Sequence, residues 1–210
     1  MYKVYEREGW GSAMVEALLE LAGQKYELIA IDPSKPDDRR ILSALNPLLQ
    51  LPTVVVPDGT VMTESGAIAL YIAEQAPHAK LAPMPGDRLR AAWLRWQVFL
   101  VATVYASHIV DDHPERWGDE AQRDDIVARG LAWRQELWQV VDRSAGSPWF
   151  LGGTFSTIDV FIAIMTRWAP RRAWFEKNTP KLRAIAEAVD RLPALQKVWA
   201  RNFGPGKDYQ

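Results

Sequence analysis

The sequence predicts an α/β N-terminal domain followed by an all-α helical bundle. Three observations support this. Residues 1–76 alternate short β-branched runs with helical periods, whereas every periodic segment in residues 88–204 is helical. A stretch rich in Pro and Gly, residues 77–87, separates the two parts and reads as a linker. Nine of the ten tryptophans lie in the second part. Residues 205–210 read as a polar tail.

The first domain begins with a strand and a helix, and this pair is then repeated. Alternating apolar residues predict the strands, and apolar residues at helical spacing predict the helices. Gly23 closes the first helix, and the second helix stops before Asn46-Pro47. In chain order, the predicted segments are a strand at 2–5, a helix at 12–22, a strand at 26–31 and a helix at 37–45.

A hairpin and a third helix complete the first domain. Pro57-Asp58-Gly59 lies between two β-branched runs, which is typical of a tight hairpin turn. A helix over residues 65–75 follows. A strand–helix–strand crossover implies a parallel strand pair, and the hairpin adds an antiparallel strand. The resulting order, βαβαββα, is thioredoxin-like.

Helical periodicity continues through the second domain. Ser156-Thr157-Ile158-Asp159 has the form of a capping box at the start of an almost wholly apolar helix, so we expect Ser156 and Asp159 to serve folding and not catalysis. The predicted helices span residues 89–108, 120–145, 157–168, 182–191 and 194–203.

Composition excludes several classes of function. The 210 residues carry a net charge of −1 with scattered Lys and Arg, so we expect no nucleic-acid partner and no membrane surface. The chain contains no Cys, which removes disulfides and a cysteine nucleophile. Asp111-Asp112-His113 would face different ways on a helix, and we assign no metal site. Without a recognisable signal peptide or membrane span, a cytoplasmic protein is expected.

The start of the third helix carries a candidate ligand cluster. Glu64-Ser65 places a carboxylate, a hydroxyl and unpaired backbone N–H groups together at a helix N-terminus. Such a cluster can bind both ends of a zwitterion, with the ammonium on Glu64 and the carboxylate on the N–H groups. The alternative is an ordinary capped helix.

Three neighbouring segments carry a family resemblance. They are Asn46-Pro47, Gln50-Leu51-Pro52 and Thr63-Glu64-Ser65-Gly66-Ala67-Ile68. At this spacing they resemble the glutathione-binding segment of the cytosolic glutathione transferases, and the capping box and two-domain order extend the likeness over nearly the whole chain. The chain is similar to the bacterial members, with the beta-like and theta-like classes both open.

The resemblance implies how glutathione, as co-substrate, would be held. The backbone of Leu51 would pair with the cysteinyl part, positioned by a cis bond before Pro52. Gln50 would reach the glycyl carboxylate. Glu64 and Ser65 would hold the amine and carboxylate of the γ-glutamyl end.

Three alternatives are open for the group that activates the glutathione thiol. Lowering the thiol pKa from about 8.5 by one to two units takes roughly 1.4–2.7 kcal/mol of thiolate stabilisation. By resemblance, the Cys of the beta-like class falls on Gly11 and the Ser of theta-like classes on Gly9, and neither residue has a side-chain donor. Ser12, at the expected N-cap, is the nearest hydroxyl. Tyr5 has the spacing of the catalytic Tyr in the alpha, mu and pi classes, and the loop backbone is the third alternative.

The resemblance also implies an acceptor site between the domains for a small electrophile, and a homodimer. Trp10, Tyr105 and His108 are the candidate acceptor-site residues, although each could instead serve the core or the surface. Three functions stay open: a glutathione transferase of a detoxifying kind, a glutathione-dependent disulfide reductase, peroxidase or isomerase, and a non-catalytic binding module.

Overall fold

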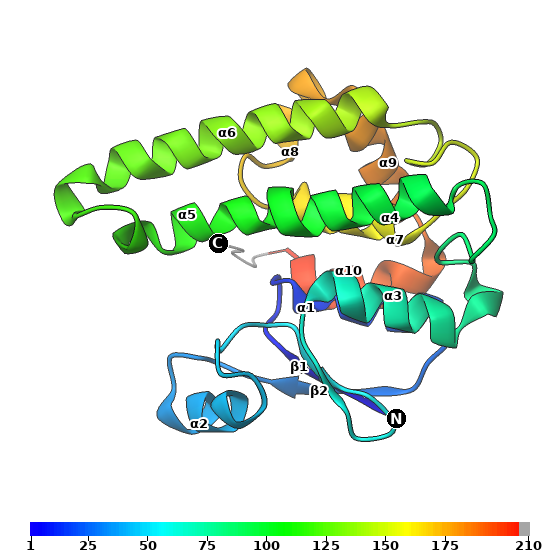
Figure 1. Cartoon of the computed structure of the whole chain (residues 1–210), viewed down its shortest axis with the longest axis horizontal. Coiled ribbons are helices and arrows are strands. Elements are labelled where there is room, and N and C mark those ends of the chain that lie inside the picture. Colours follow the sequence, from blue (N-terminus) through cyan, green and yellow to red (C-terminus); the bar gives the residue numbers. More distant parts are fainter. Residues whose placement is uncertain (206–210) are drawn as a thin grey trace. The chain divides into compact units, whose positions relative to one another are not determined.

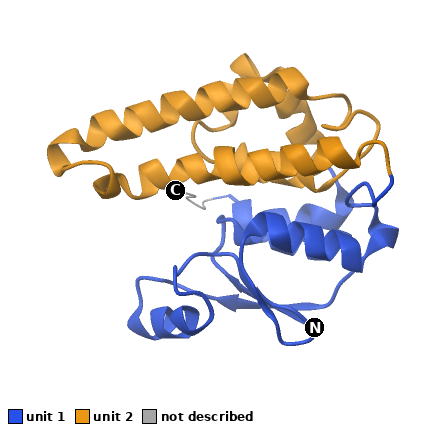
Figure 2. Ribbon diagram, in the orientation of Figure 1, with its two compact units in different colours: residues 1–86, 190–210 blue, residues 87–189 orange. Residues whose placement is uncertain are grey.

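A computed structural model describes residues 1–205 of the chain. Its contacts divide the chain into two compact units, residues 1–86 with the segment from 190 onward (unit 1), and residues 87–189 (unit 2) (Figure 2). The predicted helical domain, 88–204, therefore differs from unit 2, because the last helix packs within unit 1. Of the predicted tail, residues 206–210 lie outside the described residues.

Unit 1 is built on a four-stranded mixed sheet with the order β2-β1-β3-β4. β1 pairs with β2 in parallel, while the β1–β3 and β3–β4 pairs are antiparallel. The strands are β1 (Tyr2–Glu6), β2 (Tyr26–Ala30), β3 (Thr53–Val55) and β4 (Val61–Met62). This arrangement confirms the predicted mixed sheet and its hairpin.

The helices of unit 1 lie on both faces of this sheet (Figure 1). They are α1 (Ser12–Leu21), α2 (Pro36–Leu45), α3 (Ser65–Gln75) and α10 (Gln196–Phe203). α1 contacts β1, α3 and α10, so it is the central helix of the unit. Tyr2, Val4 and Glu6 of β1 are buried in alternation, as expected for a strand with one face covered.

Unit 2 is helical, as predicted. Its α-helices are α4 (Arg90–Phe99), α5 (Ile109–Asp112), α6 (Arg123–Ser144), α7 (Thr157–Met165), α8 (Arg172–Asn178) and α9 (Pro180–Asp190), which ends at the boundary of the unit. The helix predicted over 89–108 is instead α4 followed by a π-helical segment, Leu100–Tyr105, and one 3₁₀ turn, Ala106–His108. α8 was not predicted.

α7 is the buried centre of unit 2, and its capping box confirms the sequence prediction. The Asp159 carboxylate accepts hydrogen bonds from the backbone N–H groups of Phe150, at 2.7 Å, and Ser156, at 2.8 Å. Burial raises the pKa of Asp159 to about 7, although these hydrogen bonds act in the opposite direction. The side chain thus fixes both the start of α7 and the loop before it.

Candidate functional site

The register of the sheet brings three loop ends of unit 1 to one edge. Tyr5 of β1 is paired with Thr53 of β3, and Val54 is paired with Met62 of β4, both in antiparallel pairs. The end of β1, the segment before β3 and the segment after β4 therefore meet at the same end of the sheet. The segments before β3 and after β4 hold the predicted glutathione-binding residues, and the end of β1 leads into the loop that holds the candidates for thiol activation.

The segment before β3 is held by an asparagine whose role sequence reasoning missed. Asn46 Nδ2 donates to the Gln50 carbonyl at 3.0 Å and to Thr53 Oγ1 at 3.2 Å, and Thr53 Oγ1 donates to the same carbonyl at 2.9 Å. Leu51 and Pro52 are buried, and the peptide bond between them is cis. The only sequence signal for this role of Asn46 was the dipeptide Asn46-Pro47, which by itself predicts only a turn.

The segment after β4 places Glu64 and Ser65 at the N-terminus of α3. Glu64 is exposed and Ser65 is buried. Glu64 has φ +65° and ψ 101°, a conformation that L-residues rarely adopt. The described first turns of α1 and α3 carry no acidic side chain, so the partial positive charge of each helix end is available to an anion.

The loop between β1 and α1 is closed by Ser12. The Ser12 hydroxyl donates to the Arg7 carbonyl at 3.0 Å and accepts the Arg7 backbone N–H at 3.1 Å. Gly11, not Ser12, is the N-cap of α1, because Ser12 already lies in the first helical turn. Ser12 is 1% exposed. Its single hydroxyl hydrogen is thus committed to the loop that it closes.

Tyr5 and Trp10 lie in different surroundings. Tyr5 is partly buried and packs against an apolar cluster that includes Leu42 and Leu51. Trp10 is exposed, and the Arg7 guanidinium carbon lies 4.8 Å from its ring centroid, a cation–π contact. Tyr5 therefore has a packing role of its own, whereas Trp10 presents apolar surface.

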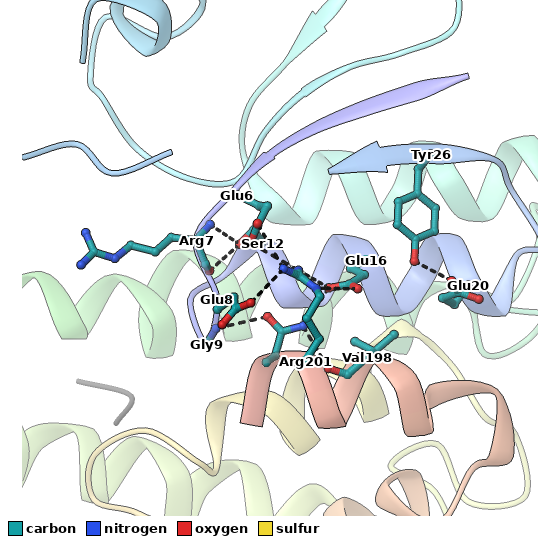
Figure 3. A network of polar contacts seen from close by, with 11 residues as sticks. Glu6, Arg7, Glu8, Gly9, Ser12, Glu16, Glu20, Tyr26, Val198 and Arg201 are labelled. Atoms are coloured by element: carbon teal, nitrogen blue, oxygen red, sulfur yellow. Dashed lines mark hydrogen bonds and ion pairs between the residues drawn. The ribbon is translucent and has the colours of Figure 1, made fainter. Parts of the chain in front are cut away.

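A polar network from α10 reaches the same loop (Figure 3). Arg201 bridges the carboxylates of Glu6, with N–O distances of 3.1 and 3.3 Å, and Glu16, with Nε–Oε1 3.0 Å. Asn202 accepts the Gly9 backbone N–H at 3.1 Å. Burial opposes the charge of Arg201, but hydrogen bonds to Glu16 and Glu6 raise the pKa of Arg201 above its ordinary value.

The remaining two candidates lie in unit 2, around Trp168. The Tyr105 ring centroid is 5.2 Å and the His108 ring centroid 5.5 Å from that of Trp168. Burial raises the pKa of Tyr105. Burial, and secondly the charge of Arg134, lower the pKa of His108 to about 3, so its imidazole is neutral near pH 7.

Arg134 donates hydrogen bonds to residues next to this aromatic group in sequence, namely Ser107 and Ala169. It is fully buried, donates from Nε to Ser107 Oγ at 2.9 Å and pairs with Asp111 at 2.7 Å. Sequence reasoning missed Arg134, because nothing in the chain pattern distinguishes it from the exposed arginines of α6.

Residues 1–205 show no metal site and no membrane-spanning helix. Within that range, no group of three or more His, Cys, Asp or Glu side chains is arranged to hold a metal ion. In the same range, no helix is both long enough and apolar enough to cross a membrane.

Comparison with known proteins identifies the family. Residues 12–75 match the family model described as the N-terminal domain of glutathione S-transferase. Over 205 residues, the chain is 35% identical to the uncharacterized GST-like protein YncG of Escherichia coli (strain K12), and the match covers 96% of this chain and 98% of that protein. The chain belongs to the glutathione S-transferase family. The predicted resemblance is thereby confirmed.

Solved structures of the glutathione S-transferase family share the fold over nearly the whole chain. A glutathione transferase homologue from Sulfitobacter, with bound glutathione, has a TM-score of 0.82 at 24% identity and covers 94% of this chain and 96% of its own. The beta-class glutathione S-transferase of Sphingomonas chungbukensis has a TM-score of 0.79 at 20% identity, covering 96% and 99%. At these identities the likeness concerns the fold.

Proposed function

We propose that this protein is a glutathione transferase that binds glutathione in unit 1, lowers its thiol pKa and directs the thiolate at a small electrophile. The observation that carries this proposal is the meeting of Glu64-Ser65 and Gln50-Leu51-Pro52 at one edge of the sheet. The rare backbone conformation of Glu64 at this helix N-terminus also supports the proposal, because strained conformations are frequent at ligand-binding sites.

In this proposal the tripeptide lies along the segment before β3. The Leu51 backbone pairs with its cysteinyl part as an added short strand, and Gln50 binds the glycyl carboxylate. Glu64 binds the γ-glutamyl amine, and Ser65 with the N-terminus of α3 binds the carboxylate beside it.

The thiolate is then directed toward the loop between β1 and α1. The Ser12 hydroxyl can donate to a thiolate only by giving up its bond to the Arg7 carbonyl, and the Tyr5 ring packs against an apolar cluster. We therefore favour backbone N–H groups of the loop and of the first turn of α1 as donors, other than those of Arg7, Gly9 and Trp10, which already have acceptors. Trp10, Tyr105 and His108 are the proposed contacts of the acceptor substrate.

We also propose that the protein acts in the cytoplasm, in detoxification and as a homodimer, as is usual in the family.

A second candidate function keeps glutathione and changes the reaction. Gly9 and Gly11 stand where many transferases carry a side-chain donor, which favours a disulfide reductase, peroxidase or isomerase. Turnover of a glutathione mixed disulfide without turnover of aryl halides would select this alternative.

The test is the ultraviolet absorbance of the bound glutathione thiolate, titrated with pH in wild type, Ser12→Ala and Tyr5→Phe. We expect a bound-thiol pKa at least about one unit below the free value of about 8.5 in all three proteins. A pKa raised by only one of the substitutions would assign the donor to that side chain. If the wild-type protein does not lower the thiol pKa, the transferase proposal is wrong.

A further inference from the structure

The loop between β1 and α1 has an anchor that comes from the other end of the chain. The Gly9 backbone N–H donates to Asn202 Oδ1, a fully buried acceptor on α10. Gly9 has φ +77°, a conformation that glycine adopts without steric cost. Because glycine imposes little conformational preference of its own, this hydrogen bond helps to fix the peptide orientation, together with the turn bond from the Trp10 N–H to the Arg7 carbonyl.

The Asn202 amide has only one favourable orientation. Its Nδ2 donates to Glu16 Oε2 at 2.7 Å and to the Val198 carbonyl at 3.0 Å. Both partners are acceptors only, so the amide oxygen must face Gly9. Glu16 is in turn held by Arg201, which also binds Glu6 at the end of β1 (Figure 3).

We infer that Asn202 is a positioning residue for thiol activation, acting through the Gly9 backbone. This inference rests on the proposed function, in which backbone N–H groups of the loop stabilise the thiolate. Donors aimed before the ligand arrives need no reorganisation when charge develops, which is why a fixed loop activates better than a free one.

The charges around the loop are not altered by the test substitution. They come from Glu6 of β1, Arg7 and Glu8 of the loop, Glu16 of α1, Arg201 of α10, and Asp32, which pairs with Arg7. Asn202 is neutral, so Asn202→Ala removes the anchor and leaves this set of charges in place. A shift in thiol pKa in the variant therefore reports on orientation and not on net charge.

The experiment compares Asn202→Ala with Leu195→Ala, a buried apolar truncation in the turn that precedes α10. In Asn202→Ala we expect the bound-thiol pKa to rise by about one unit, equivalent to an about tenfold lower acid dissociation constant of the thiol. The glutathione Kd should change less than about threefold, because Glu64 and Ser65 are untouched. Leu195→Ala should lower the Tm and leave the thiol pKa at the wild-type value. An unchanged thiol pKa in Asn202→Ala, or an equal rise in both variants, overturns the inference.

Amide hydrogen exchange in the ligand-free proteins separates this inference from the proposed function. Asn202→Ala should speed the exchange of a peptide covering residues 7–11 by about tenfold, while Leu195→Ala should not do so selectively. Unchanged exchange in Asn202→Ala refutes the anchor whatever the activity. If wild type fails to lower the thiol pKa, the proposed function fails and the catalytic role of Asn202 fails with it. Asn202→Ser, too short to reach both Gly9 and Glu16, carries the same expectations if the alanine variant does not fold.

Discussion

Glu64 stores backbone strain at the point where the γ-glutamyl amine of the ligand is proposed to bind. A non-glycine residue at φ +65° and ψ 101° costs about 1–3 kcal/mol. Glycine relieves most of that cost but loses about 0.5–1 kcal/mol through its more flexible unfolded state. Glu64→Gly should therefore have a free energy of unfolding about 1 kcal/mol above that of Glu64→Ala.

Both Glu64 variants lose the carboxylate, so both should bind glutathione at least about tenfold more weakly than wild type. Urea unfolding measures the stabilities, and calorimetric titration measures the affinities. A Glu64→Gly variant about 0.5–1 kcal/mol less stable than Glu64→Ala would mean that the conformation carries no strain. Wild-type affinity in both variants would remove Glu64 from the site.

His108 gives unit 2 a pH dependence whose sign follows from burial. Burial and the nearby Arg134 lower the pKa of His108 to about 3, whereas the unfolded value is about 6.5. Between these values the unfolded chain binds more protons, so His108 makes stability fall as the pH falls through this window. Relative to His108→Gln, wild type should lose about 1.4 kcal/mol per pH unit from pH 6 to pH 4.

Taking the difference between the two proteins cancels the other titrating groups, including Asp159, whose raised pKa acts in the opposite direction. Urea unfolding from pH 4 to pH 8 measures both proteins. Parallel curves would show that His108 titrates normally in the folded state.

At the scale of the element, α7 depends on one carboxylate. Asp159→Ala leaves the buried N–H groups of Phe150 and Ser156 without an acceptor, so we expect a loss of about 2–4 kcal/mol in the free energy of unfolding. Asp124→Ala, in the exposed first turn of α6, is the matched control and should cost less than about 1 kcal/mol. Similar losses in both variants would mean that only the helix dipole is at work.

Elements with a strong local signal were predicted closely from sequence. The helix predicted over 65–75 is α3 (Ser65–Gln75), and that over 12–22 is α1 (Ser12–Leu21), since apolar spacing and flanking breakers defined their ends. α8 was missed because its seven residues follow Pro170 and have too few turns for a clear period. The π-helical segment Leu100–Tyr105 was missed because it keeps helical apolar spacing.

The candidate site was predictable only where its residues are neighbours in sequence. Gln50-Leu51-Pro52 and Glu64-Ser65 form short motifs, and the sheet register then places them together. The hydrogen bonds from Arg201 to Glu6 and Glu16 join residues that are 195 and 185 positions apart in the chain. The spacing of apolar residues predicts helices and strands, but it does not predict contacts between side chains so far apart in sequence. Ser12 was expected as an N-cap, but Gly11 has that position. The hydrogen bond from the Ser12 hydroxyl to the Arg7 carbonyl depends on the conformation of the loop, which the sequence does not reveal.

At the scale of the whole molecule, unit 1 is discontinuous in the chain, and Arg201 joins its two parts. Arg201→Leu would leave the buried Glu6 and Glu16 carboxylates without their cationic partner, and we expect a loss of about 3 kcal/mol in the free energy of unfolding. Arg129→Leu, which breaks an exposed pair with Asp125, should cost no more than about 0.5 kcal/mol. Urea unfolding compares the two, and equal losses would contradict a stabilising role for the network.

The discontinuity of unit 1 also has a consequence for the order of synthesis. Glu6, Gly9 and Glu16 leave the ribosome first, while Arg201 and Asn202 follow only after all of unit 2 has been made. Domains generally begin to fold as they emerge from the ribosome. Until α10 has been synthesised, the Glu6 and Glu16 carboxylates therefore lack Arg201, and the loop between β1 and α1 lacks its hydrogen bond to Asn202. A translation product that stops before α10 would contain every proposed glutathione contact and still lack Asn202, the anchor of the loop. Only a chain that has been translated through α10 would therefore activate the thiol.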